Sequence, residues 1–171
     1  MKGPDMKSPT KFFVLLASLF LACVAAVSAP AQPADYSVYP HLAGKLDLAG
    51  ENMGLAGFPL WGDDYFAVCN ETSGLMILQV SGDTLGLVGS IDVIGQEKDI
   101  QVADWYGFVS TSGGLAAVSL AVPATPSSLG FVNLAGDGDR QLALSATHAY
   151  VACGSAGLAV IDISNPSGMY V

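Results

Sequence analysis

A repeated apolar run is the feature that most restricts the fold of this sequence. Three Gly-Leu pairs begin at Gly74, Gly114 and Gly157, 40 and 43 residues apart, and each opens an apolar run. Four residues beyond each leucine the run holds a single polar residue; these are Gln79, Ser119 and Asp162. Breaks at Gly82, Pro123 and Asn165-Pro166 end the runs. A period of about 40 residues is typical of β-propeller blades.

Each repeat holds four segments with strand character. Before the Gly-Leu run, across a short Gly-, Ser- or Asn-rich turn, lie apolar segments at 65–69, 107–111 and 149–153, a pattern typical of hairpins. Segments with period-two alternation precede these at 58–64, 99–105 and 140–148. Still earlier come segments that close on glycine, at 45–50, 90–95 and 131–136. The sequence therefore predicts four short strands per repeat, and the first strand of each repeat is the segment at 45–50, 90–95 or 131–136.

The Gly-Leu strands are apolar on both sides, and this favours one architecture. In 158–163, Leu158 and Val160 face one way, whereas Ala159, Ile161 and Ile163 face the other. Such a sheet needs neighbours in front and behind, and stacked propeller blades supply them. A β-sandwich is the main rival, and a helix over 114–121 is disfavoured by the prolines that flank the repeats. We predict an all-β chain of about three four-stranded antiparallel blades in an incomplete ring.

The segment AYVACGSAGLAVIDISNPS, residues 149–167, resembles the LVIVD repeat of exported prokaryotic proteins. Residues 90–126 are a looser copy and 45–83 looser again. The resemblance implies β-propeller blades and export, and the family has no agreed catalytic residues to transfer. The copies depart from its pattern: Cys153 replaces the usual acid, with Asn70 and Ser112 in that region of the other copies, and LAVPATP replaces the usual ending of the second.

The N-terminus has the layout of a secretory signal peptide. Lysines at positions 2, 7 and 11 precede an unbroken apolar run at 12–27, and Ala29-Pro30-Ala31 forms a cleavage site before Gln32. We expect cleavage after Ala31 and a secreted, periplasmic or cell-surface product. There are three alternatives: cleavage after Ala29, lipid attachment at Cys23 and an uncleaved membrane anchor. Lipid attachment is considered because Cys23 follows Leu21-Ala22.

The expected layout is a signal peptide at 1–31, a linker at 32–44 and three blades at about 45–87, 88–130 and 131–171. Closed propellers have about four to eight blades, so three leave a ring open. We expect a chain truncated from a longer repeat protein; completion by another copy and an open solenoid are the alternatives. Two uncovered apolar blade faces then favour self-association.

The charge balance limits the partners. Without residues 1–31 the chain has three cations against 14 acidic residues, a formal charge of −11. Nucleic acid is excluded because it requires a basic surface, and an anionic membrane is disfavoured unless the protein is lipidated at Cys23. An unknown protein or glycan remains as the expected partner.

Two cysteines remain after cleavage, Cys69 and Cys153, in a compartment that permits disulfides. Each lies three residues after an aromatic residue, Phe66 or Tyr150, which places both at the same position of the first and third blades. Two blade steps of about 10 Å exceed the Cα separation of about 7 Å that a disulfide can bridge. The sequence predicts two unpaired, buried thiols.

Patterns typical of catalysis are scarce. His41 and His148 lack metal-ligand spacing and are expected in surface segments, and Ser110, Ser112 and Ser155 are expected in or beside turns. We predict no catalytic residue, no metal ligand and no cofactor.

Three polar or aromatic groups stand out besides these. Asp137-Gly138-Asp139 has a D-x-D spacing that suits Ca²⁺, but no later glutamate completes an EF-hand loop, so a turn is expected. Glu51, Glu97 and Asp99 lie in corresponding loops and predict one acidic face. Trp61 and Trp105 fall in neighbouring repeats, where they either form a recognition surface or cap the blade edges; we expect capping.

These observations favour an exported, non-catalytic repeat module that binds a protein or glycan. The alternative is part of a propeller enzyme whose central active site is completed by blades outside this sequence. A third possibility is a truncated form without a function.

Overall fold

A computed structural model describes residues 46–82, 84–137 and 140–171. The chain divides into two compact units, Met1–Leu42 and Ala43–Val171, and all described residues belong to the second. The predicted signal peptide, Cys23, His41 and the predicted linker lie outside the described residues. Within the described residues, no helix has the length and apolar character needed to cross a membrane.

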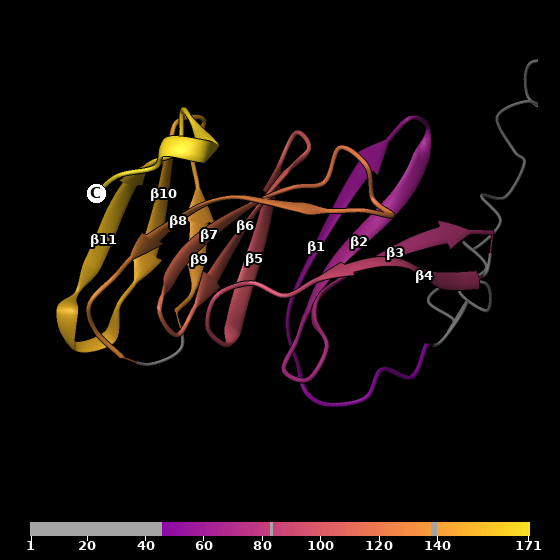
Figure 1. Ribbon diagram of the computed structural model, residues 1–171, viewed down its shortest axis with the longest axis horizontal. Helices are drawn as coiled ribbons and strands as arrows, with labels where there is room; N and C mark the ends of the chain where they lie inside the picture. Colours follow the sequence, from indigo (N-terminus) through magenta and orange to yellow (C-terminus); the bar gives the residue numbers. More distant parts are fainter. Residues whose placement is uncertain (1–45, 83, 138–139) are drawn as a thin grey trace, which may run out of the picture. The chain divides into compact units, whose positions relative to one another are not determined.

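The described residues form three antiparallel sheets with strands in chain order (Figure 1). The first sheet contains β1 (Asn52–Leu60), β2 (Asp63–Asn70), β3 (Gly74–Ser81) and β4 (Thr84–Ile91). The second contains β5 (Glu97–Ala103), β6 (Tyr106–Thr111), β7 (Gly114–Ser119) and β8 (Ser127–Asn133). The third contains β9 (Leu142–Leu144), β10 (His148–Ala152) and β11 (Leu158–Asp162), with short 3₁₀ turns η1 (Gly154–Ala156) and η2 (Pro166–Gly168). A single bridge joins Asp162 to Tyr170 beside β11.

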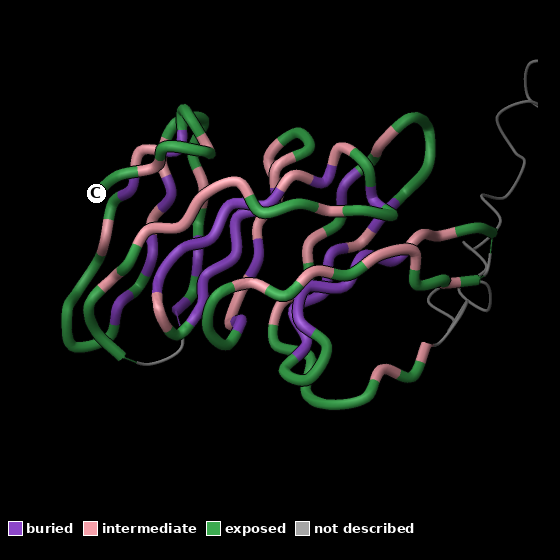
Figure 2. Tube along the Cα trace, in the orientation of Figure 1, coloured by how far each residue is buried: buried purple, intermediate pink, exposed green. Residues whose placement is uncertain are grey.

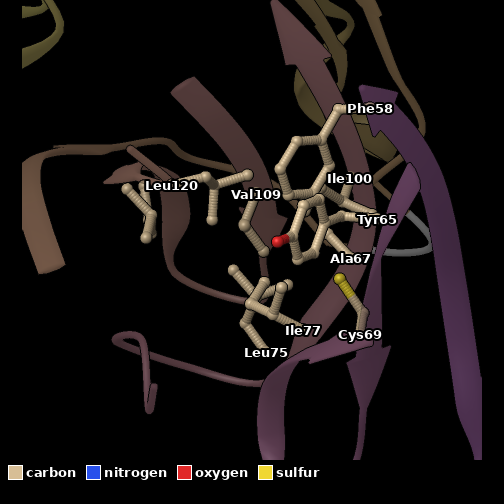
Figure 3. Packing of buried hydrophobic residues seen from close by; sticks show 11 residues of the cluster. Phe58, Tyr65, Ala67, Cys69, Leu75, Ile77, Ile100, Val109 and Leu120 are labelled. Carbon is tan, nitrogen blue, oxygen red and sulfur yellow. The ribbon is translucent and has the colours of Figure 1, made fainter. Parts of the chain in front are cut away.

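The sheets pack face to face in chain order, which confirms the predicted all-β fold with blade-like sheets. One core lies between the first and second sheets and includes Ala67, Leu75, Ile77, Ile100 and Val109 (Figure 3). Another lies between the second and third sheets and is formed by residues such as Phe108, Leu115, Val151 and Ile161. The buried segments of the trace accordingly lie in the central strands of each sheet (Figure 2). At each of these two junctions between sheets, both sheets contribute an apolar face, as the two-sided apolar pattern predicted.

The strands are assigned to sheets differently from the sequence prediction. Residues 90–91 and 131–133, predicted to start a repeat, instead end β4 and β8 and pair with β3 and β7. The predicted strand at 45–50 is wrong, because residues 46–50 are irregular. The first halves of β4 and β8 were missed, since TLGLVG and SSLG are rich in Gly and Ser and show no period-two alternation. Each sheet therefore begins on the strand that the sequence placed second.

The glycines in these outer strands have a packing role. A Cβ atom on Gly89 in β4 would overlap the carbonyl oxygen of Pro123, in the loop after β7. A Cβ atom on Gly130 in β8 would overlap the carbonyl oxygen of Pro166, in the loop after β11. Both sheets thus end on a strand whose glycine admits the proline-containing loop of the next sheet.

The single polar residue of the second and third apolar runs is the last residue of its strand, whereas Gln79 lies inside β3. The Ser119 hydroxyl accepts a 3.5 Å hydrogen bond from the Ala121 backbone N–H. The Asp162 carboxylate accepts one of 2.8 Å from the Ser164 N–H and one of 3.1 Å from the Tyr170 hydroxyl. These side chains satisfy the backbone where it leaves the sheet.

Cys69 and Cys153 are both buried and unpaired, as predicted. They do not occupy the same position, however. Strand pairing aligns Cys69, opposite Leu75, with Ala152, opposite Leu158, so Cys153 is one residue further along. Because successive strand residues face opposite ways, Cys69 joins the first core and Cys153 the second. The sequence alignment was wrong because it matched Tyr150 with Phe66, whereas strand pairing places Tyr150 at the position of Ala67.

Candidate functional site

A cavity of about 280 Å³ lies where the first strands of the three sheets begin. Its lining includes Met53 and Lys98, which occupy corresponding bulge positions in β1 and β5. Arg140 and Gln141, just before β9, complete the lining together with Asp99. Arg140 holds the corresponding position in the third sheet. The Gln141 carbonyl accepts the Ala152 N–H, so Gln141 lies opposite Ala152 as Asp99 lies opposite Ser110. Arg140 precedes Gln141 just as Lys98 precedes Asp99. The three sheets therefore direct equivalent positions toward one space.

Two charged groups of this cavity, Asp99 and Arg140, are hydrogen-bonded to the protein backbone. The Asp99 carboxylate accepts hydrogen bonds from the Ile100 N–H (2.8 Å) and the Leu142 N–H (2.9 Å). The Arg140 guanidinium, only 1% exposed, donates to the carbonyls of Leu134 (3.1 Å) and Gly136 (2.9 Å). These bonds give Asp99 and Arg140 structural roles between the second and third sheets.

Arg140 also contacts Cys153, with 3.7 Å between Nη1 and Sγ. The sequence analysis missed Arg140 and the bulge residues Met53 and Lys98. A usable signal existed, because Lys98 and Arg140 are the only cations after position 45 and lie 42 residues apart, one repeat.

Two buried acid–base groups lie at the first junction. Burial raises the pKa of the Cys69 thiol to about 12, and the nearby charges of Glu97 and Asp99 add to this rise. Burial also raises the pKa of Glu97, a buried residue at the start of β5. A thiol with so high a pKa is protonated and unreactive, which agrees with a packing role.

The predicted histidine and serine positions are scattered over the fold. His148 opens β10, and its Nδ1 lies 2.8 Å from the Thr147 hydroxyl oxygen. Ser112 lies in a turn, where its hydroxyl accepts a 3.1 Å bond from the Gln96 N–H. Ser110 lies near the end of β6, beside the turn; it is fully buried, and its hydroxyl donates to the Arg140 carbonyl. Ser110 thereby joins the second and third sheets.

Asp137 lies in the irregular segment that follows β8. Its carboxylate accepts hydrogen bonds from the Ser155 N–H (3.2 Å) and hydroxyl (2.9 Å), and these bonds hold its pKa below the usual value. The rest of the D-x-D motif, Gly138 and Asp139, lies outside the described residues. Over the ranges that are described, no group of three or more His, Cys, Asp or Glu side chains is placed to hold a metal ion.

The opposite end of the first strands carries the two tryptophans. Pairing of Leu60 with Asp63 encloses Trp61 and Gly62 in the β1–β2 turn. Pairing of Ala103 with Tyr106 encloses Asp104 and Trp105 in the β5–β6 turn. Strands β1 and β5 belong to neighbouring sheets and pack together, so both turns emerge at the same edge (Figure 1). We call residues 61–64 and 104–106 the tryptophan edge.

The tryptophans do not cap the sheets, so that expectation was wrong. Trp61 is 76% exposed and Trp105 is 48% exposed. Trp105 is supported on one side by Tyr106, with ring centroids 5.9 Å apart. Trp61 also has a backbone φ of 54°, a conformation that costs a bulky residue about 1–3 kcal/mol. A large indole held in solvent by a strained turn is typical of a recognition surface.

Comparison with known proteins supports the repeat at the C-terminal end. No curated protein matches the chain. A family model described as the LVIVD repeat matches residues 136–171, which include β9, β10 and β11. These residues also contain the segment that shows the resemblance in the sequence. The predicted resemblance to the LVIVD repeat is thereby confirmed for residues 136–171.

Proposed function

We propose that this chain is a non-catalytic repeat module that binds a protein or glycan through the tryptophan edge. The observation that carries the proposal is the exposure of Trp61 and Trp105 on corresponding turns of neighbouring sheets. Exposed tryptophans are enriched in binding surfaces because they offer a large, rigid contact area. Asp99 and Arg140 in the cavity are held by backbone groups, so that cavity gives the enzyme alternative no specific support.

Binding is tested with arrays of glycans and peptides and a double variant, Trp61→Ala/Trp105→Ala. The unmodified chain is expected to bind at least one class of ligand saturably, and the double variant to lose that binding. Thr147→Ala is the matched control, because Thr147 lies in the corresponding turn before β10, which has no tryptophan. Equal binding by the chain and the double variant would contradict the proposal.

Export is a second part of the proposal, and it rests on the sequence of residues 1–31. Mass spectrometry of the protein from an exporting bacterial host is expected to show a mature chain that begins at Gln32. A lipid-modified chain that begins at Cys23 would support the anchored alternative. Retention of Met1 in the cytoplasmic fraction would contradict export.

Self-association through the outer face of the third sheet is a third part. Leu75 and Leu115 are fully buried at the two junctions, whereas the corresponding Leu158 is 64% exposed. Val160 is likewise exposed, although the corresponding Ile77 and Ala117 are buried. Among the described residues, no further sheet covers this face as the equivalent faces are covered, and a second copy of the chain offers the same kind of sheet.

Light scattering after size exclusion tests the association. The chain is expected to form concentration-dependent oligomers, and Leu158→Glu/Val160→Glu to shift the population toward monomer. Leu87→Glu is the control, since Leu87 is also exposed but lies in β4 of the first sheet. A chain that is monomeric at all concentrations would contradict this part alone.

A further inference from the structure

The tryptophan edge combines aromatic faces with charge of one sign. Trp61 is followed closely by Asp63 and Asp64, and Asp104 directly precedes Trp105. All three aspartates are exposed. Each exposed indole therefore has a carboxylate one to three residues away along the chain.

The positive charges of the described residues lie elsewhere. They are Lys98, at the start of β5, and Arg140, just before β9, which places both at the end of the sheets opposite the hairpin turns. Arg140 is also buried and bonded to carbonyl groups. The loops that share the edge with the tryptophans, at 120–126, 145–147 and 163–169, contain no lysine or arginine. A cation approaching this edge meets indoles and carboxylates without a like charge among the described residues.

We propose that the tryptophan edge binds a basic segment of a protein partner, one that exposes lysine or arginine. The indole face attracts an ammonium or guanidinium group, and a neighbouring carboxylate accepts its N–H donors. Neighbouring sheets pack about 10 Å apart, so two basic residues close together in one segment reach Trp61 and Trp105 at the same time. This inference rests on the proposed binding function and specifies the class of its partner.

Charge separates this partner from a glycan. A neutral sugar also stacks on an indole, but Asp63, Asp64 and Asp104 do not draw it toward the edge. Attraction between a basic segment and exposed carboxylates weakens as salt screens it, over about 30 Å at 0.01 M ionic strength but only about 8 Å at 0.15 M. The response to salt therefore identifies the class of ligand.

The test is a fluorescence titration of the full chain. The sequence contains only two tryptophans, so the indole signal reports on this edge alone. The probes are a short lysine-rich peptide, the same peptide with glutamate in place of lysine, and a neutral cello-oligosaccharide. We expect a saturable change with the lysine peptide only, and a Kd that rises roughly tenfold between about 0.01 M and about 0.15 M ionic strength.

Two sets of charge variants locate the attraction. The triple variant Asp63→Asn/Asp64→Asn/Asp104→Asn is expected to weaken binding roughly tenfold. Asparagine also suits position 104, whose φ of 54° favours Asp or Asn. The control is Glu51→Gln/Glu71→Gln/Asp92→Asn, which changes net charge equally with exposed residues at the opposite end and is expected to leave Kd within about twofold.

Trp61→Gly separates recognition from folding. Glycine relieves the positive φ at this exposed site, so the melting temperature is expected to stay equal or rise while binding falls. A lower melting temperature together with retained binding would show that Trp61 serves the fold instead, and would overturn the inference.

The remaining outcomes are equally decisive. Equal weakening by both triple variants would show diffuse attraction to an acidic protein and would overturn the inference. Salt-independent binding of the oligosaccharide, with none of the lysine peptide, would overturn it while the binding-module proposal survives. A chain that responds to none of the probes, and binds nothing on the arrays, removes both.

Discussion

The two junctions between neighbouring sheets are built by different means. At the first, the nine-residue β1 runs along β5, and Gly54 brings the two backbones so close that a Cβ on it would lie 2.9 Å from the Asp99 Cα. At the second, β9 has only three residues, and polar bonds from Asp99 and Ser110 reach the backbone of residues 140–142.

Corresponding positions show this contrast most directly. Strand pairing aligns Gly54 with Asp99, opposite Cys69 and Ser110 respectively. Gly54 and Cys69 are small or apolar, whereas Asp99 and Ser110 are polar. Apolar burial grows with the length of strand that is covered, so a short inner strand gains less from it. Specific hydrogen bonds, rather than additional buried apolar area, then hold the third sheet against the second.

The largest expected effect comes from the centre of the second junction. Arg140→Ala should lower the free energy of unfolding by about 3 kcal/mol, because it leaves two carbonyl groups without a donor and creates a cavity. Urea denaturation measures the change. The control Lys98→Ala removes the corresponding half-exposed cation of the second sheet and should stay within about 0.5 kcal/mol. Equal losses for both variants would show that burial of Arg140 contributes nothing to stability.

The glycine contacts of β4 and β8 are shared by both junctions. Gly89→Ala and Gly130→Ala should each cost about 2 kcal/mol, because the added methyl displaces the backbone at Pro123 or Pro166. Gly86→Ala, in β4 with open space around its Cα, is the matched control and should not destabilise. Thermal unfolding of the three variants compares them. Loss at only one of Gly89 and Gly130 would show that the sheets do not share this contact.

Stability at alkaline pH distinguishes the first junction. The Cys69 pKa of about 12 lies above the ordinary thiol value of 9.0, so the folded state retains a proton that the unfolded state loses above about pH 9. The contribution is complete below that pH and should be lost at about 1.4 kcal/mol per pH unit as pH rises toward 12.

Cys69→Ala provides the comparison for that slope. Urea denaturation between pH 8 and about 10.5 should show a steeper loss for the unmodified chain than for the variant. Parallel curves would contradict a protonated, buried thiol. Tyrosine and lysine side chains also titrate near the upper end of this range, but both proteins carry the same ones, so the difference between the two curves reports on Cys69.

The smallest effect is expected for Asp99→Asn. Asparagine keeps one acceptor oxygen and loses the other, so one of the bonds to Ile100 and Leu142 is lost, at about 1 kcal/mol. Hydrogen exchange should show faster exchange of the Leu142 amide or of the Ile100 amide. Unchanged protection at both amides would remove Asp99 from the second junction.

The sequence predicted the class of fold from the spacing of its Gly-Leu pairs, but it assigned strands to the wrong sheets. Segments 90–95 and 131–136 have apolar alternation, which identifies a strand without identifying its partner. Whether such a strand opens one sheet or closes the previous one depends on pairing with β3 or β7 over a turn. The Gly- and Ser-rich halves of β4 and β8 gave no periodic signal, because the glycines are required by loops distant in the chain.

The candidate sites show the same division. Trp61 and Trp105 were identified from the sequence, but their exposure was predicted wrongly because the two-residue turns that project them were read as parts of strands 58–64 and 99–105. Ser110 was expected in or beside a turn, but its burial and its bond to the Arg140 carbonyl were not predicted. Neither Arg140 nor the bulge at Lys98 belongs to a recognisable motif, since a bulge is defined by what opposes it on the partner strand.

The sequence by itself determined that the fold is all-β, that its unit is about 40 residues long and that Cys69 and Cys153 are unpaired and buried. These follow from local periodicity and spacing, which the order of residues contains. Tertiary structure alone decided which strand closes each sheet, which way Cys69 and Cys153 face, and which charges are buried. A shift of one residue reverses the face of a strand, and only the packed sheets select the register.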